Sequence, residues 1–240
     1  MNMKITYIAH SGFSVELDHH VLLFDYFTGS IPDWDPEKSV LVFASHKHRD
    51  HFNHCIFELY QKYPKIRFFL GTDIRLNEKW YQGKGFDPAV IESVTRMKAK
   101  ETAVWKDVSI VSLKSTDAGV AFVVKAEGYT FYHAGDLHWW HWDGEPDPFN
   151  PKMEADFKRS MELIKGMHFD VAFVPLDPRL ERAYDWGMNY FLECTETDRV
   201  FPMHMWEEYD FILKYKEQMP DRREKIFEIH ERGEVFDLWK

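Results

Sequence analysis

One short polar stretch concentrates the residue types that hold metal ions in proteins. It follows an apolar run that ends at Ala44 and contains His46, His48, Asp50 and His51. In extended backbone, residues two apart point the same way, so His46 and His48 can converge on one point while Asp50 and His51 reach another nearby. Imidazole and carboxylate groups are ligands that zinc, manganese and iron share. The stretch therefore predicts a metal centre, the alternative being a solvated polar loop that happens to hold histidines.

The elements around this stretch must bring its side chains together. β-branched and aromatic runs separated by turn residues precede it, which predicts a β-meander. A second block of this kind begins near residue 103, and helical patterns alternate with apolar strands beyond Pro151. The predicted helices cover 52–63, 152–164 and 207–218. The predicted strands cover 4–8, 13–17, 21–26, 40–44, 66–70, 103–105, 108–113, 120–126, 130–133, 171–174, 200–203 and 225–229.

Two β-rich blocks, each followed by helices, bury their apolar faces well as an αββα sandwich. This is an α/β fold with two facing mixed β-sheets and helices on both outer faces. The sequence has no repeat of solenoid period, no low-complexity tract and no linker rich in Pro, Gly or Ser. We therefore expect a single domain over residues 1–240.

The composition limits the kinds of partner that the protein is expected to bind. The net charge of −10 comes without a basic block, so a generic electrostatic grip on nucleic acid is not expected. Cys55 and Cys194 lie far apart, so a disulfide framework is absent and a reducing cytoplasm fits best. Met1 to Lys4 lead straight into a strand pattern without an apolar signal, and we expect no membrane partner. We therefore expect a small-molecule substrate. The composition is also compatible with an oligomer.

The string H-x-H-x-D-H at residues 46–51 resembles the signature of the metallo-β-lactamase superfamily. Other residues resemble the remaining motifs of that family in the expected order: Asp25, Gly135-Asp136 and His204. The resemblance implies that Asp25 supports the site through hydrogen bonds, that Asp136 bridges two metals, and that His204 closes the second site. Within the superfamily, residues 8–13 and 132–136 most resemble the branch that contains ascorbate-6-phosphate lactonase.

The resemblance implies a metal-dependent hydrolase that holds one or two divalent ions, zinc first, then manganese or iron, and no other cofactor. Site one would use His46, His48 and Asp136, and site two Asp50, His51, Asp136 and His204. The family usually has a further site-one histidine in a loop that here runs from Lys114 to Gly119 and contains none. Three alternatives remain open: water completes the site, Asp117 replaces the histidine, or a histidine from residues 137–143 does.

The implied reaction is attack by a metal-bound hydroxide on a small ester-like bond, a phosphorylated lactone in particular, with His48, Asp50 and Asp136 as catalytic residues. Asp50 would orient or deprotonate the attacking water. Two alternatives are a phosphodiesterase acting on a small phosphodiester and a non-catalytic metal-binding or sensing protein of the same fold.

A loop rich in Trp and His follows the predicted bridging aspartate. It reads Leu137, His138, Trp139, Trp140, His141, Trp142, Asp143. Such aromatic clusters are as often packing as function. The functional interpretation is a wall that stacks on the substrate and excludes water, with His138 or His141 as a polar contact.

Overall fold

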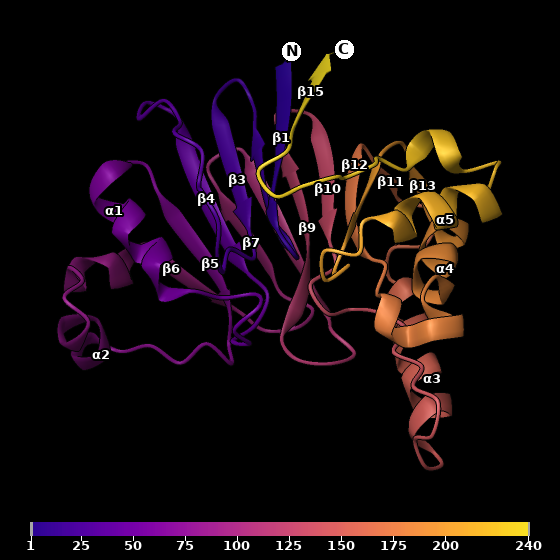
Figure 1. Ribbon diagram of the computed structural model, residues 1–240. Coiled ribbons are helices and arrows are strands. Elements are labelled where there is room, and N and C mark those ends of the chain that lie inside the picture. The colour runs from indigo at the N-terminus through magenta and orange to yellow at the C-terminus, as the bar shows by residue number, and fades with distance from the viewer. Residues whose placement is uncertain (1, 240) are drawn as a thin grey trace. The chain divides into compact units, whose positions relative to one another are not determined.

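The computed structural model describes residues 2–239 (Figure 1). The chain divides into two compact units. Unit 1 comprises residues 1–98 and 232–240, and unit 2 comprises residues 99–231. The expectation of a single domain stays a prediction.

Unit 1 contains a seven-stranded mixed sheet in the order β15-β1-β2-β3-β4-β5-β6. Strands β15, β1, β2 and β3 pair antiparallel, whereas β3, β4, β5 and β6 pair parallel. The two ends of the chain lie side by side because β1 pairs with β15 (Figure 1). The strands are β1 Asn2–Ala9, β2 Gly12–Glu16, β3 His20–Phe24, β4 Ser39–Ala44, β5 Arg67–Gly71, β6 Val94–Met97 and β15 Val235–Trp239.

Short helices cover one face of this sheet (Figure 1). They are the 3-10 helices η1 (His54–Glu58) and η2 (Pro88–Ser93), with α1 (Leu59–Lys62) and α2 (Glu78–Gly83). Phe57 and Tyr81 from these helices belong to one buried cluster with Val42 of β4. Every residue of β3 and β4 is buried, as their near-continuous apolar runs require in the parallel part of a sheet.

Unit 2 contains a six-stranded mixed sheet in the order β14-β12-β10-β9-β8-β7 and a two-stranded parallel sheet, β11-β13. In the larger sheet, β14, β12 and β10 pair parallel, and β10 to β7 pair antiparallel. Pro202 is tolerated in β14 because an edge strand can lack a ladder N–H. The strands are β7 Thr102–Trp105, β8 Val108–Lys114, β9 Val120–Ala126, β10 Tyr129–His133, β11 His168–Phe169, β12 Val171–Pro175, β13 Glu196–Thr197 and β14 Val200–Met203.

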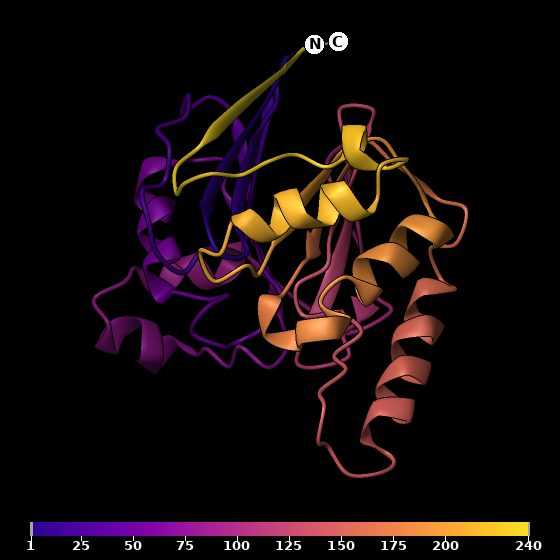
Figure 2. The same ribbon diagram turned by 45° about the vertical axis from the view of Figure 1, so that its right-hand side comes forward.

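Helices of unit 2 lie along one side of its larger sheet (Figure 2). Tyr132 of β10 stacks on Phe191 of α4 with ring centroids 4.8 Å apart, and Ser160 of α3 donates a hydrogen bond to the carbonyl of Lys114. The helices are α3 Phe149–Met161, η3 Pro178–Ala183, α4 Trp186–Cys194, α5 Asp210–Gln218 and η4 Arg223–Lys225. Among residues 2–239, no helix is long and apolar enough to cross a bilayer.

Two local predictions need correction. The strand predicted over 225–229 is wrong: residue 226 forms only an isolated bridge to Val200, and Phe227 stacks on Phe201. The helix predicted over 52–63 is instead the 3-10 helix η1 followed by the single turn α1. In both segments the apolar spacing identified side chains that are buried, such as Ile56 and Ile226, but it did not determine the type of backbone that carries them.

Candidate metal centre

The ends of neighbouring parallel strands position the ligand-type residues of unit 1. Asp25 directly follows β3 and Ser45 directly follows β4, and these two strands pair in parallel with Phe24 opposite Phe43. The Asp25 N–H donates to the Phe43 carbonyl over 2.9 Å, which holds the loop after β3 beside the end of β4. Loops at the carboxyl ends of parallel strands meet at one edge of a sheet. The polar stretch predicted to bind metal therefore begins next to Asp25.

The Asp25 carboxylate organises this edge. It is fully buried and accepts three hydrogen bonds: from the Ser45 N–H at 2.7 Å, the Ser45 hydroxyl at 2.6 Å and His51 Nδ1 at 2.7 Å. A buried carboxylate is stable only with such donors. Because His51 Nδ1 must carry the proton in this bond, His51 Nε2 keeps its lone pair. The bond therefore prepares Nε2 to act as a metal ligand.

Asp25 also orients His46 through Ser45. The Ser45 hydroxyl has one proton and gives it to Asp25, so the 2.9 Å contact between Ser45 Oγ and His46 Nδ1 requires His46 Nδ1 to donate. The lone pair of His46 then lies on Nε2, which is 2.9 Å from His48 Nδ1. His46 is buried and His48 is exposed. Two imidazole nitrogens thus converge at the end of β4.

Asp50 and His51 form a second group with His10, and the donor atoms of the three lie within 4.8 Å of one another. Asp50 Oδ2 is 3.5 Å from His10 Nε2 and 3.9 Å from His51 Nε2. Burial by itself would raise the pKa of Asp50, but the hydrogen bond from His10 and the neighbouring His51 outweigh it and hold the pKa well below its ordinary value. Asp50 is therefore a carboxylate over the range in which proteins work.

Unit 2 brings together Asp136 and His204, the residues that follow β10 and β14. His204 Nε2 lies 3.4 Å from Asp136 Oδ1. His204 Nδ1 lies 2.7 Å from Oδ2 of Asp177, a fully buried residue after β12. Burial would raise the pKa of Asp177, but hydrogen bonds from His204 and Arg179 outweigh it and lower the pKa. Asp177 thus fixes the tautomer of His204 as Asp25 fixes that of His51.

Backbone strain gathers at these residues. His10, Asp25 and His204 all have left-handed backbone, with φ of 55°, 41° and 67°. For residues other than glycine this conformation costs on the order of 1–3 kcal/mol, and it is concentrated at sites where function requires it. The donor set, imidazole nitrogens and carboxylates with their orienting partners, fits a divalent first-row transition metal.

The loop that lacks the family's further histidine lies beside Asp136. Thr116 Oγ1 donates to the His138 carbonyl over 2.6 Å and lies 3.2 Å from the Asp136 carbonyl oxygen. Of the proposed substitutes, His141 contacts Arg182 at 3.0 Å and Asp143 at 3.3 Å. These partners give His141 a role in holding its own loop.

His138 is fully buried, and neither of its ring nitrogens has a hydrogen-bond partner among the described residues. Burial lowers its pKa to about 3, so the ring is neutral. A Cβ at Gly187 would lie 2.3 Å from His138 Cε1, so glycine at the start of α4 makes room for this ring. The structure therefore packs His138 inside unit 2.

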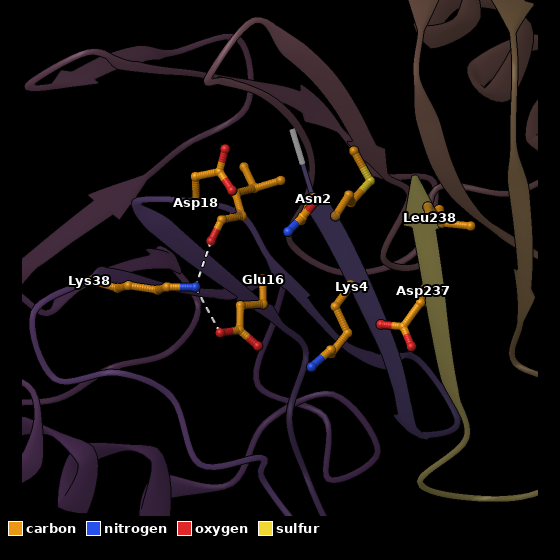
Figure 3. A pocket seen from close by; sticks show the side chains of 9 residues that line it. Asn2, Lys4, Glu16, Asp18, Lys38, Asp237 and Leu238 are labelled. Carbon is orange, nitrogen blue, oxygen red and sulfur yellow. Dashed lines mark hydrogen bonds and ion pairs between the residues drawn. The ribbon is translucent and has the colours of Figure 1, made fainter. Parts of the chain in front are cut away.

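A hollow of about 430 Å³ in unit 1 lies at the edge formed by β1, β2 and β15 (Figure 3). Lys38 Nζ donates there to Glu16 Oε1 over 2.8 Å and to the Leu17 carbonyl over 2.7 Å. None of the predicted ligands is among the described residues that line it. The residue types that support chemistry are gathered elsewhere.

The mixed sheets, the covering helices and the histidines and aspartates at strand ends define a metallo-β-lactamase fold. A model of the β-lactamase superfamily domain matches residues 4–143, and this chain belongs to that family. A UPF0173 metal-dependent hydrolase from Nitratidesulfovibrio vulgaris is 29% identical over 150 residues, 57% of this chain and 59% of that relative. The UPF0173 metal-dependent hydrolase YtkL from Bacillus subtilis is 26% identical over 214 residues, 84% of this chain and 85% of the relative. This chain thus spans about six-tenths of the first relative and most of the second.

Solved structures share the fold at low sequence identity. Igni18, a metallo hydrolase from Ignicoccus hospitalis, superposes with a TM-score of 0.67 at 18% identity over 100% of both chains. CmlA, a diiron β-hydroxylase from Streptomyces venezuelae, gives a TM-score of 0.63 at 11% identity over 98% of this chain and 54% of its own. At these identities the likeness shows the fold alone.

Two residues of these groups, His10 and Asp177, carry only weak signals in the sequence. His10 is one of several histidines near strand ends, and its place beside Asp50 depends on the turn between β1 and β2. Asp177 belongs to no motif that the sequence shows. The available signal was its position after an apolar strand, which it shares with Asp25 and Asp136.

Proposed function

We propose that this protein is a metal-dependent hydrolase that cleaves a small ester-like bond. The relatives named metal-dependent hydrolases support the reaction class. Motifs at residues 8–13 and 132–136 resemble the branch containing ascorbate-6-phosphate lactonase, and on that ground we propose a lactone, a phosphorylated lactone in particular, as the substrate. We also propose a cytoplasmic location, because Cys55 and Cys194 are both free thiols.

The observation that carries the proposal is the set of three hydrogen bonds to Asp25. The buried Asp25 carboxylate orients His51 directly and orients His46 through Ser45. A solvated polar loop would gain little from having its histidines oriented in this way. This arrangement is the one by which proteins orient imidazole ligands. We propose that the metal ligands are His46, His48, Asp50, His51, Asp136 and His204, with zinc as the first candidate and manganese or iron as the others.

A bound divalent ion would supply Lewis acidity and would lower the pKa of water towards neutrality. The chain's own residues then orient and remove protons. Asp50 remains ionised, and His10 Nε2 lies 3.5 Å from its Oδ2. We propose that this Oδ2 accepts a proton or a hydrogen bond from the attacking water. We propose that His48 and Asp136 hold the reacting groups in place.

The test is metal-dependent turnover by the purified protein. The protein is treated with chelator, reconstituted separately with zinc, manganese or ferrous iron, and assayed on a panel of lactones, phosphorylated lactones, simple esters and bis(p-nitrophenyl) phosphate. We expect turnover of the lactones or esters that chelation removes and one of the metals restores. Replacing His48 with Ala should abolish it, whereas replacing His19, an exposed turn residue of the same unit, should not.

Two results would favour one of the alternative functions. Turnover confined to the phosphodiester would favour the phosphodiesterase alternative. Metal binding without turnover of any substrate class would favour the non-catalytic metal-binding protein.

A further inference from the structure

Tryptophan side chains flank Asp136 and His204 within unit 2. Trp140 Nε1 donates to the Asp136 carbonyl over 2.9 Å, and the Trp140 ring lies 5.3 Å from the His204 ring. The Trp206 ring lies 5.7 Å from the same imidazole at an interplanar angle of 88°. Trp142 is parallel to Trp140, with 4° between their planes and 6.3 Å between their centroids. Flat indole surfaces therefore approach the proposed metal ligands from two loops.

Arg179 lies between two of these rings. Its guanidinium carbon is 4.5 Å from the Trp206 centroid and 5.7 Å from the Trp142 centroid. The guanidinium donates through Nε and Nη2 to Asp177, so Nη1 takes no part in that pair. The Asp177 side chain is fully buried, whereas the Arg179 side chain is 44% exposed. The group of this ion pair that reaches the surface beside the indoles is therefore the guanidinium.

The rings are held by contacts that do not depend on a ligand. The side chain of Asn150 donates to the Trp142 carbonyl over 2.8 Å and accepts from the Trp142 N–H over 3.0 Å. Arg182 pairs with Asp143, the next residue along. A binding surface that is rigid before the ligand arrives loses less entropy on binding.

The second loop is strained and exposes a large ring. Trp206 and Glu207 have left-handed backbone, with φ of 53° and 67°, next to His204 at 67°. Trp206 is 43% exposed, although its Nε1 donates to Asp177 Oδ2 over 3.4 Å. Strain and exposed aromatic surface both lower stability, and they persist where binding requires them.

We propose that Trp142, Trp206 and Arg179 form a subsite for a planar conjugated ring that carries a negative charge. Indole faces stack on flat rings, and a guanidinium between them pairs with an anionic substituent. A puckered saturated ring touches an indole face over a smaller area and lacks the attraction between two aromatic rings. The inference rests on the proposed function in one respect, since it places the bond to be hydrolysed beside His204. The substrate class is then an ester or lactone of a planar, anionic ring.

Binding can be tested without turnover. Naphthalene-2-sulfonate is a planar anion whose sulfonate is a poor metal ligand, cyclohexanesulfonate is an anion without a flat ring, and 2-naphthylmethanol is flat and neutral. Each is titrated against the purified full-length protein, with binding followed by NMR line broadening of the probe. We expect naphthalene-2-sulfonate to bind about 3- to 10-fold more tightly than either control, the range that one aromatic contact supplies.

Variants locate the contact. Replacing Trp206 with Leu should weaken naphthalene-2-sulfonate about 3- to 10-fold and leave cyclohexanesulfonate unchanged. Trp105 is the matched control, because a lysine, Lys106, lies 4.4 Å from its ring at the end of β7. Trp105→Leu should change nothing. Equal binding of the three probes, or equal effects of the two substitutions, would overturn the proposal.

The outcome separates this inference from the proposed function. Selective, Trp206-dependent binding by a protein that hydrolyses no ester would support the subsite and contradict the hydrolase assignment. Turnover of flat and puckered esters with equal KM, with Trp206→Leu matching the parent, would support the hydrolase and overturn the subsite.

Discussion

Replacing Asp25 with Asn should lower the metal affinity of the protein while leaving most of its folding stability. The substitution preserves the shape of the side chain and removes its charge. Asp25 has left-handed backbone, with φ of 41°, which asparagine tolerates at least as well as aspartate. Its amide oxygen can still accept from the Ser45 N–H. The amide nitrogen, however, would face the Ser45 hydroxyl and His51 Nδ1, which both donate to the carboxylate at 2.6 and 2.7 Å.

The loss of unfolding free energy depends on how far the hydrogen-bonding groups around residue 25 can rearrange. Two hydrogen bonds to a buried charged acceptor contribute about 1.5–3 kcal/mol each, so a rigid site would lose about 3–6 kcal/mol. The Ser45 hydroxyl can rotate to accept from the new amide, and His51 can move its proton to Nε2. These changes should reduce the loss of unfolding free energy to about 2–3 kcal/mol. Moving the His51 proton to Nε2 also removes the lone pair that His51 would offer a metal, so the affinity for the metal should fall about 10- to 100-fold.

The assay pairs urea denaturation of the chelator-treated protein with competition titration of zinc against a chromophoric chelator. Asp33→Asn is the control, since Asp33 is 82% exposed in the same unit and pairs with Lys62 at the surface. It should leave metal affinity unchanged. An Asp25→Asn protein with reduced stability and unchanged zinc affinity would refute the argument that Asp25 sets the tautomers of the ligand histidines.

Three further predictions test other parts of the site and the fold. His48→Ala should abolish hydrolysis while the melting temperature stays within a few degrees of the parent, because His48 is exposed; equal activity would contradict the motif assignment. Trp142→Ala should raise KM for an identified substrate more than it lowers metal affinity, and an unchanged KM would leave packing as the role of the loop. Burial raises the pKa of Tyr81 to about 12, so its contribution to stability is complete below about pH 10 and is lost as the pH rises through 12. Tyr81→Phe should flatten the fall in unfolding free energy above pH 10, and an identical slope in both proteins would show that Tyr81 does not ionise on unfolding.

Much of the fold could be predicted because burial follows local pattern. The apolar runs that became β3 and β4 are buried along their whole length, and the ligand-type residues follow β4 as the sequence implied. β15 could not be predicted, because its pairing with β1 joins the two ends of the chain. The supporting role of Asp177 was equally hidden, since its partner His204 lies 27 positions away and the intervening chain carries a helix.

The polar network required the structure for a further reason. The sequence shows that Ser45 and His46 are neighbours, but it does not show that the serine hydroxyl bridges Asp25 and the imidazole. That bridge determines which nitrogen of His46 keeps a lone pair. Ligand type can therefore be read from sequence, whereas ligand protonation depends on contacts made after folding.

The metal content of the protein tests the central claim most directly. After equilibrium dialysis against zinc, the bound metal is measured by mass spectrometry during a stepwise chelator titration of the parent, His46→Ala and His204→Ala. Site two has four proposed donors and site one has three, so one ion should leave the parent early and another late. His46→Ala should lose the early ion and His204→Ala the late one. His19→Ala, an exposed-histidine control, should retain the zinc content of the parent. A parent protein that retains no zinc, or His46→Ala and His204→Ala variants that both retain the full content of the parent, would contradict the account.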